Sequence, residues 1–225
     1  SLPPGQWNRT WPRDMSYAIA ALARTGFRDA AYDALSFVLE APAGAYVEEV
    51  GSDYLVSVCR YYGDGTEESD GDPAGVGPNI EFDGFGLFLW ALGVWADGQE
   101  DLTPIAAHWP TLRERVADVI VSLVEADTGL MAADSSIWEV HWNGNQKHFT
   151  YTNAAAVAGL CAASRLAERL GDVEAQELYG EVAQTIRDGV LTHLVDPDTG
   201  VLMGNLEEMA AGEALDSAAV EAINW

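Results

Sequence analysis

Apolar residues recur with the spacing of one helical face along most of the chain. From Met15 they continue at Ile19, Leu22 and Ala23, and Gly26 ends the run. This i, i+4, i+7 spacing is typical of an amphipathic helix. The same kind of pattern predicts further helices over residues 29–40, about 52–62, from 83 through 94, within 102–125, over 151–170 and 173–194, and from 215 onward.

Strand patterns are weak by comparison. No stretch gives a convincing strand, so we expect strands only as short hairpins within loops. The acidic, glycine-rich stretch 63–77 is expected to be a surface loop. Residues 154–163 are apolar on nearly every side, which predicts a helix buried between two layers. The chain is therefore predicted to be all-α.

One short sequence is repeated after two of the predicted helices. Asp-Thr-Gly occurs at 127–129 and again at 198–200, each time between the end of a helix and a short apolar segment. The triplet alone is common in turns. Its recurrence at the same place favours a toroid of helical hairpins whose loops gather at one end.

Composition narrows the class of protein. With 225 residues and 48% hydrophobic side chains, the chain forms one domain, residues 1–225, or a large piece of one. The formal net charge of −25 argues against nucleic acid and anionic membranes as partners. Cys59 and Cys161 lie in apolar surroundings typical of small core residues. Localisation and oligomeric state are not indicated by the sequence.

Metal and cofactor signals are weak. The four histidines show no paired spacing on one helical face, so a zinc site is not predicted. The acidic stretch 64–72 lacks the spacing of a twelve-residue calcium loop, so a solvated loop is the better interpretation. Phosphate-binding and serine-hydrolase motifs are absent as well. We expect no cofactor.

The segment around Trp138 and Glu139 carries the strongest chemical signal. A carboxyl beside a large indole loses hydration, so its pKa rises and it can stay protonated near neutrality. That property suits a general acid for glycosidic bond cleavage. The alternative is that Trp138 and Glu139 are ordinary surface residues beside a helix start. The rest of the sequence has to decide between these two interpretations.

A second group of candidate residues lies at the start of the first predicted helix, in the segment Trp7-Asn8-Arg9-Thr10-Trp11-Pro12-Arg13-Asp14. A guanidinium beside a carboxylate can bind neighbouring hydroxyls both as donor and as acceptor. The alternative is that Asp14 only caps the helix and Arg13 pairs with a surface acid. Two tryptophans in the same short loop favour a sugar subsite.

In order and rough spacing, these motifs resemble the glucoamylase-like family, glycoside hydrolase family 15. The resemblance covers almost the whole chain. It rests on Trp11-Pro12-Arg13-Asp14, Ile80-Glu81-Phe82-Asp83-Gly84, Ile137-Trp138-Glu139, Phe149-Thr150-Tyr151-Thr152 and Leu215-Asp216-Ser217-Ala218.

The resemblance implies an (α/α)6 toroid, incomplete in this chain, that hydrolyses terminal α-glucosidic bonds of oligo- or polysaccharides with inversion. It implies that Glu139 is the general acid. Arg13 and Asp14 would bind hydroxyls of the terminal glucose, and Trp11 and Trp138 would wall the pocket. Asp83 is a further candidate for the cleft, with a helix N-cap role as an equal alternative.

The resemblance leaves one catalytic group unassigned. An inverting glycosidase needs a second carboxylate to activate water, and in this family that base lies on a late helix, beyond where this chain stops. The chain is therefore expected to be a fragment of a larger enzyme, an incompletely ordered chain or a relative that has lost catalysis. A non-catalytic module that binds sugars or a protein partner is the alternative function.

Overall fold

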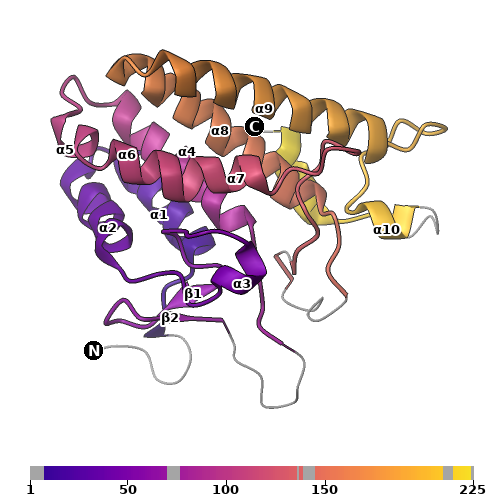
Figure 1. Ribbon diagram of the computed structural model, residues 1–225, viewed down its shortest axis with the longest axis horizontal. Coiled ribbons are helices and arrows are strands. Elements are labelled where there is room, and N and C mark those ends of the chain that lie inside the picture. Colours follow the sequence, from indigo (N-terminus) through magenta and orange to yellow (C-terminus); the bar gives the residue numbers. More distant parts are fainter. Residues whose placement is uncertain (1–7, 70–76, 136, 139–144, 210–214, 224–225) are drawn as a thin grey trace.

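The computed structural model describes residues 8–69, 77–135, 137–138, 145–209 and 215–223. The order of elements is largely helical, as predicted (Figure 1). The helices are α1 (Pro12–Arg24), α2 (Arg28–Glu40), α3 (Val47–Val50), α4 (Asp83–Asp97), α5 (Thr103–Ala106), α6 (Trp109–Leu112), the π-helical η2 (Arg113–Ala117), α7 (Asp118–Ser122), α8 (Thr150–Leu170), α9 (Val173–His193), α10 (Leu206–Met209) and the 3-10 helix η3 (Ser217–Ile223).

The helices form two layers. α4 lies between α1 and α8, while α2 packs on α1 and α9 packs on α8 (Figure 1). Most positions of α4 and α8 are buried, whereas α2 and α9 bury only one face. The predicted burial of 154–163 is confirmed, because every one of these residues except Cys161 is buried in α8. A helix that is apolar all round packs against neighbours on several sides.

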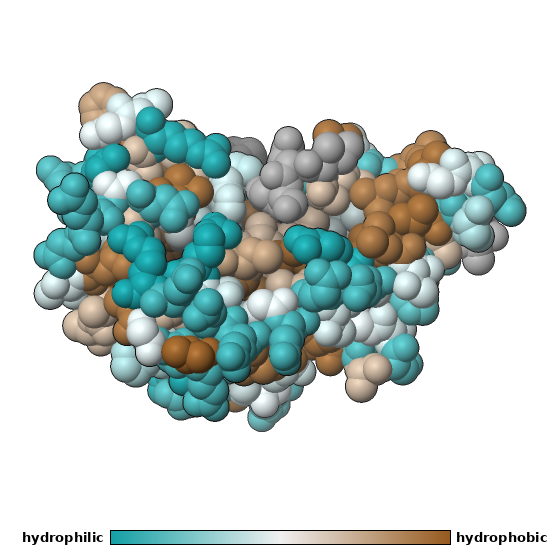
Figure 2. Space-filling model, turned by 90° about the horizontal axis from the view of Figure 1, so that it is seen from above, coloured by the Kyte–Doolittle hydropathy of each residue, from teal (hydrophilic) through white to brown (hydrophobic). Residues whose placement is uncertain are grey.

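One face of the molecule is polar over most of its area (Figure 2). Figure 2 shows the molecule from above, turned by 90° from the view of Figure 1. Hydrophilic side chains cover much of this face, and apolar ones gather in smaller patches. Among the described residues, no helix has the length and the hydropathy that a bilayer span requires. Cys59 and Cys161 are not joined by a disulfide.

The helix predicted over residues 52–62 is wrong. This segment is irregular and ends in strand β1 (Arg60–Tyr61), which pairs antiparallel with β2 (Glu67–Glu68). All side chains from Tyr54 to Tyr61 are buried, so their apolar spacing carries no information on a helical face. Side chains satisfy part of the segment's backbone instead: the N–H of Val58 donates to Glu67 at 3.0 Å, and the N–H of Ser57 donates to the hydroxyl of Tyr61 at 2.6 Å.

Two other predicted helices are present in altered form. The helix expected within 102–125 is divided into α5, α6, η2 and α7, and a proline stands in the first turn of both α5 and α6. Proline fits a helix start but not a helix interior, which explains the divisions there. The helix expected from 215 onward is the 3-10 helix η3 over its described residues.

The repeated Asp-Thr-Gly segments have the same structure. Each closes an isolated antiparallel bridge, Val124 with Met131 and Val195 with Leu202. Gly129 and Gly200 adopt φ angles of 70° and 71°, the left-handed region that glycine enters without steric cost. The repetition read from the sequence is therefore a repeated turn after two helices.

Backbone contact between α4 and α8 limits which residues can stand at their crossing. A Cβ atom added to Gly86 would lie 2.2 Å from the carbonyl oxygen of Ala155, and one added to Gly159 would lie 2.4 Å from the carbonyl oxygen of Gly86. Any side chain here would push the two helices apart.

We predict that Gly86→Ala lowers the free energy of unfolding by about 3 kcal/mol or more, because overpacking displaces the whole crossing. The matched control is Gly180→Ala in α9, where the added Cβ would meet only the Ser164 hydroxyl at 3.7 Å. That change should stabilise the helix by up to about 1 kcal/mol. Urea unfolding of both variants measures the difference, and equal effects would contradict the backbone contact.

Candidate active site

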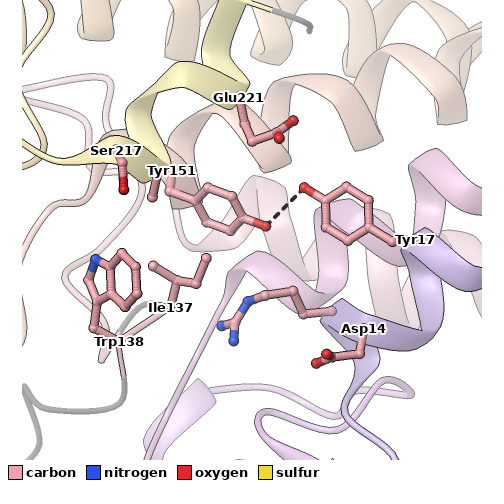
Figure 3. Close-up of a pocket in the computed structure, with 9 residues that line it drawn as sticks. Asp14, Tyr17, Ile137, Trp138, Tyr151, Ser217 and Glu221 are labelled. Atoms are coloured by element: carbon pink, nitrogen blue, oxygen red, sulfur yellow. Dashed lines mark hydrogen bonds between the residues drawn. The ribbon is translucent and has the colours of Figure 1, made fainter.

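A hollow of about 340 Å³ opens where α1, α8, the Trp138 segment and η3 meet (Figure 3). Three residues predicted from the sequence, Arg13, Asp14 and Trp138, line it together. Glu139 lies outside the described residues. The full lining is Arg13, Asp14, Tyr17, Ile137, Trp138, Tyr151, Ser217, Ala218 and Glu221.

Arg13 is held at the hollow by two carboxylates from another element. Its Nε donates to Oδ2 of Asp83 at 2.7 Å and its Nη2 donates to Oδ1 of Asp83 at 3.1 Å. The same Nη2 also donates to Glu81. This two-pronged pairing fixes the plane of the guanidinium as well as its position. The alternative that Arg13 pairs with a surface acid is wrong, because Asp83 is buried.

The charge of Arg13 is secured by these partners. Burial lowers the pKa of Arg13, but the negative charges of Asp83 and Glu81 outweigh that effect and raise its pKa well above the ordinary value. Asp83 stands at the first residue of α4, and the N-cap position belongs to Phe82. The alternative of Asp83 as the N-cap is therefore wrong, and its carboxylate pairs with Arg13 instead. Asp83 is not among the residues that line the described hollow.

Asp14 occupies the next position on α1 and is exposed at the hollow. The N-cap of α1 is Trp11, whose side chain makes no capping hydrogen bond, so the alternative of Asp14 as the cap is wrong. Its place in the first turn is favourable for a carboxylate because the positive end of the helix dipole lies there. Asp14 thus presents an acceptor beside the fixed donors of Arg13.

Aromatic side chains form the remaining wall. Trp138 is 51% exposed, and its indole N–H donates to Oδ2 of Asp216 at 2.8 Å. The other oxygen of Asp216 accepts from the N–H of Ala218 at 2.8 Å, at the start of η3. Trp138 is therefore fixed against η3 while its ring faces the hollow, an arrangement that suits stacking on a sugar ring.

Two tyrosines that the sequence reasoning missed lie across from Trp138 (Figure 3). The hydroxyls of Tyr17 and Tyr151 are 3.2 Å apart. Burial, with the charge of Asp83 as a second cause, raises the pKa of Tyr151 far above its usual value. Both phenols remain neutral at physiological pH; one O–H is used in the bond between them, and the other can donate to a sugar oxygen. Tyr151 belongs to the motif Phe149-Thr150-Tyr151-Thr152, so the sequence offered a signal for it. Tyr17 lies in no such motif, and it reaches the hollow only because of the way α1 packs.

Trp11 is placed differently from its prediction. Its ring lies under the guanidinium of Arg60, 5.5 Å from Arg60 Cζ to the ring centroid, and Arg60 is held by Glu68 of β2. Trp11 does not line the described hollow, so its predicted role as a sugar wall stays a prediction. Among the residues that the structure describes, no three or more His, Cys, Asp or Glu side chains gather as a metal site.

A second charged cluster lies on the segment that leads into α8. His148 Nδ1 contacts Glu207 at 2.5 Å, and its Nε2 contacts Glu125 at 3.1 Å. The hydrogen bond with Glu207 is the main reason that the pKa of His148 is raised to about 9; burial opposes it and Glu125 adds to it. Lys147, the residue before His148, pairs with Glu208. Both glutamates of α10 are thus engaged in ion pairs.

Comparison with solved structures defines the class of fold. A glucoamylase from Saccharomycopsis fibuligera superposes with a TM-score of 0.67 at 15% identity, over 96% of this chain and 47% of the other. A glycosidase variant gives a TM-score of 0.72 at 19% identity, over 96% and 54%. A bacterial glucoamylase complexed with acarbose gives 0.59 at 18% identity, over 88% and 24%. The chain has the (α/α)6 fold of these proteins, in part.

The sequence comparisons identify the family. The model of glycosyl hydrolases family 15 matches residues 1–222, and the chain belongs to this family. A trehalase from Mycolicibacterium smegmatis is 26% identical over 227 residues, which cover 95% of this chain and 31% of that protein. A trehalase from Mycobacterium tuberculosis is 30% identical over 109 residues, 48% of this chain and 14% of that protein. This chain thus spans less than a third of either trehalase.

We predict that Asp83→Asn and Asp14→Asn, the same chemical change at a buried and an exposed carboxylate, differ strongly in their effect on stability. Asp83→Asn should cost about 3 kcal/mol of unfolding free energy, the low end for breaking a buried pair, since Glu81 still pairs with Arg13. Asp14→Asn should leave stability within about 0.5 kcal/mol, because the group is exposed. Urea denaturation measures both, and equal losses would contradict the anchoring of Arg13.

We also predict that the contribution of His148 to stability depends on pH. The folded pKa of about 9 exceeds the unfolded value of about 6.5, so the ion pairs stabilise fully below about pH 6.5 and the gain is lost as pH rises through 9. The Tm deficit of His148→Gln should therefore be largest near pH 6 and should shrink above pH 9. His193→Gln at the end of α9 is the matched control; a deficit that is constant with pH would refute the prediction.

Proposed function

We propose that the protein hydrolyses α-glucosides from the non-reducing end and binds the terminal glucose in the hollow between α1 and η3. The observation that carries the proposal is the anchored guanidinium of Arg13 beside the exposed carboxylate of Asp14, facing the indole of Trp138. A sugar needs this combination, since its hydroxyls require donors and acceptors together while its C–H face packs on an aromatic ring.

The chemistry that fits this site is inverting acid/base hydrolysis. Glu139 follows Trp138 directly and would give its proton to the glycosidic oxygen as the C1–O bond breaks. Water would attack C1 from the opposite face and lose its proton to a second carboxylate. From the family resemblance we expect that carboxylate on a later helix, and no residue of this chain is assigned to the role.

Trehalose is the first substrate to test. Both matched mycobacterial proteins are named trehalases, and the hollow is near the lower end of the range for small-molecule sites. A small hollow suits a disaccharide or the end of a chain. Maltose and malto-oligosaccharides are the next candidates, because glucoamylases share the fold.

We predict that Glu139→Gln abolishes release of glucose while binding of the sugar survives. Glutamine keeps the size of the side chain but cannot supply the proton, and loss of general acid catalysis typically costs 10²- to 10⁴-fold in rate. Glucose release is measured on the longest polypeptide that the gene encodes, and binding is measured by calorimetry on this chain. Glu177→Gln on the exposed side of α9 controls for the lost charge.

Two results would decide against the assignment. Unchanged turnover in Glu139→Gln would exclude this residue as the acid. Binding of trehalose or maltose without glucose release by the unaltered longest polypeptide would favour the alternative, a sugar-binding module without catalysis.

A further inference from the structure

We propose that Asp134 is a positioning residue that holds the start of α4, the start of α8 and the segment before Trp138 in register at the hollow. The inference rests on the proposed use of the hollow as a sugar site. It concerns a residue that neither lines the hollow nor belongs to the motifs identified from the sequence.

The backbone of Asp134 is fixed on both sides. Its N–H donates to the carbonyl of Lys147 at 3.1 Å, and the N–H of Lys147 returns the bond at 3.0 Å. The next residue, Ser135, donates its N–H to the carbonyl of Ile80 at 2.8 Å. The segment that leads to Trp138 is therefore tied to the approaches of α8 and α4 before it reaches the hollow.

The side chain of Asp134 ties the same two helices a second time. Its Oδ2 accepts from the N–H of Phe82 at 2.9 Å and from the hydroxyl of Thr152 at 3.0 Å, and its Oδ1 lies 3.1 Å from the same hydroxyl. The group is 1% exposed, so these bonds are shielded from water. Buried hydrogen bonds of this kind specify one arrangement strongly, because leaving either partner unpaired is costly.

Each contact leads directly to a residue of the site. Phe82 precedes Asp83, which anchors Arg13. Thr152 follows Tyr151, which lines the hollow, and Trp138 stands four residues after Asp134. One carboxyl group thus sets the start of α4, the start of α8 and the Trp138 segment relative to one another.

The charges around Asp134 favour its neutral form. Burial, followed by the negative charge of Asp83, raises the pKa of Asp134 to about 8; the N–H of Phe82, the hydroxyl of Thr152 and the charge of Arg13 oppose the rise. The residue of α8 that contacts the carboxyl group is Thr152, which carries no charge. Lys147, on the segment paired with Asp134, forms its ion pair with Glu208 and not with Asp134. Ionised, Asp134 would add a further negative charge near Asp83, which with Glu81 already pairs with Arg13.

The direction of the pH effect follows from these values. The unfolded pKa is about 3.9 and the folded one about 8, so the folded chain keeps a proton that the unfolded chain has lost. Stability from this group therefore falls as pH rises from about 4 to 8 and is constant above. Asp134→Asn, which mimics the neutral acid, should gain in Tm relative to the unaltered protein over that interval.

The decisive experiment follows Trp138 directly. The chain is labelled with 5-fluorotryptophan, and the Trp138 resonance is assigned by its loss in Trp138→Phe. In the unaltered protein this resonance should shift between pH 7 and 9, and binding of trehalose or maltose should weaken about tenfold, the coupling that corresponds to one pKa unit. In Asp134→Asn both should stay at their neutral-pH values, and in Asp134→Ala both should be altered at every pH.

Two controls separate positioning from general loss of stability or from another titration. Ile186→Ala removes a fully buried side chain from α9, away from the hollow, and should leave the Trp138 resonance in place. His148, beside Lys147, titrates near the same pH; a pH shift that persists in Asp134→Asn would assign it to His148 and overturn the proposal.

An unaltered Trp138 resonance in Asp134→Ala would overturn the proposal as well. If the unaltered protein binds neither sugar, the proposed function fails. The resonance then still decides the role of Asp134, so the two failures are distinguishable.

Discussion

The buried ion cluster of Arg13 with Glu81 and Asp83 is the interaction on which the arrangement of the site depends. α1 supplies the cation, and the start of α4 and the residues just before it supply the anions. A charge removed from water is costly unless it is paired with good geometry, so α1 can dock on α4 in only one rotation. That rotation turns the adjacent Asp14 and, one helical turn later, Tyr17 toward the hollow.

Cations are scarce in this chain, and the structure uses them to join segments that are distant in sequence. With 11 basic residues against 36 acidic ones, most carboxylates must remain solvated. Arg60 and Arg9 both bind Glu68 and thereby fasten β2 to the approach of α1. Lys147 and His148 join α10 to the start of α8, and Arg113 joins η2 to the N-cap of α9. Ion pairs thus join these segments to one another, while the long helices pack on one another through apolar contacts.

The sequence predicted the parts of the fold in which one face is apolar and the other polar. α1, α2 and α9 begin and end close to their predicted bounds, because helical periodicity marks their buried faces. It failed over 52–62, where every side chain from Tyr54 to Tyr61 is buried and Glu67 binds the backbone. No periodicity can show that a side chain further along the chain will take the place of a helical hydrogen bond.

The candidate site divides in the same way. Arg13, Asp14 and Trp138 could be singled out because each stands in a short motif of unusual composition. The role of Asp83 in anchoring Arg13 could not, since the two are 70 positions apart and only the docking of α1 on α4 reveals the pair. Asp134 lies in none of the motifs on which the family resemblance rests. It stands out because its side chain is buried, and the burial of an aspartate cannot be predicted from the sequence.

The place of the hollow follows from the topology of the helical hairpins. Arg13 and Asp14 lie in the first turn of α1, Asp83 in the first turn of α4 and Tyr151 in that of α8, so the three inner helices all begin at the site. Each helix start carries partial positive charge and unpaired N–H groups. Carboxylates gathered there are stabilised by these dipoles, which lets a strongly acidic chain place several of them around one cation. A toroid of hairpins thus brings the starts of its inner helices to one end, and the chemistry collects where those starts converge.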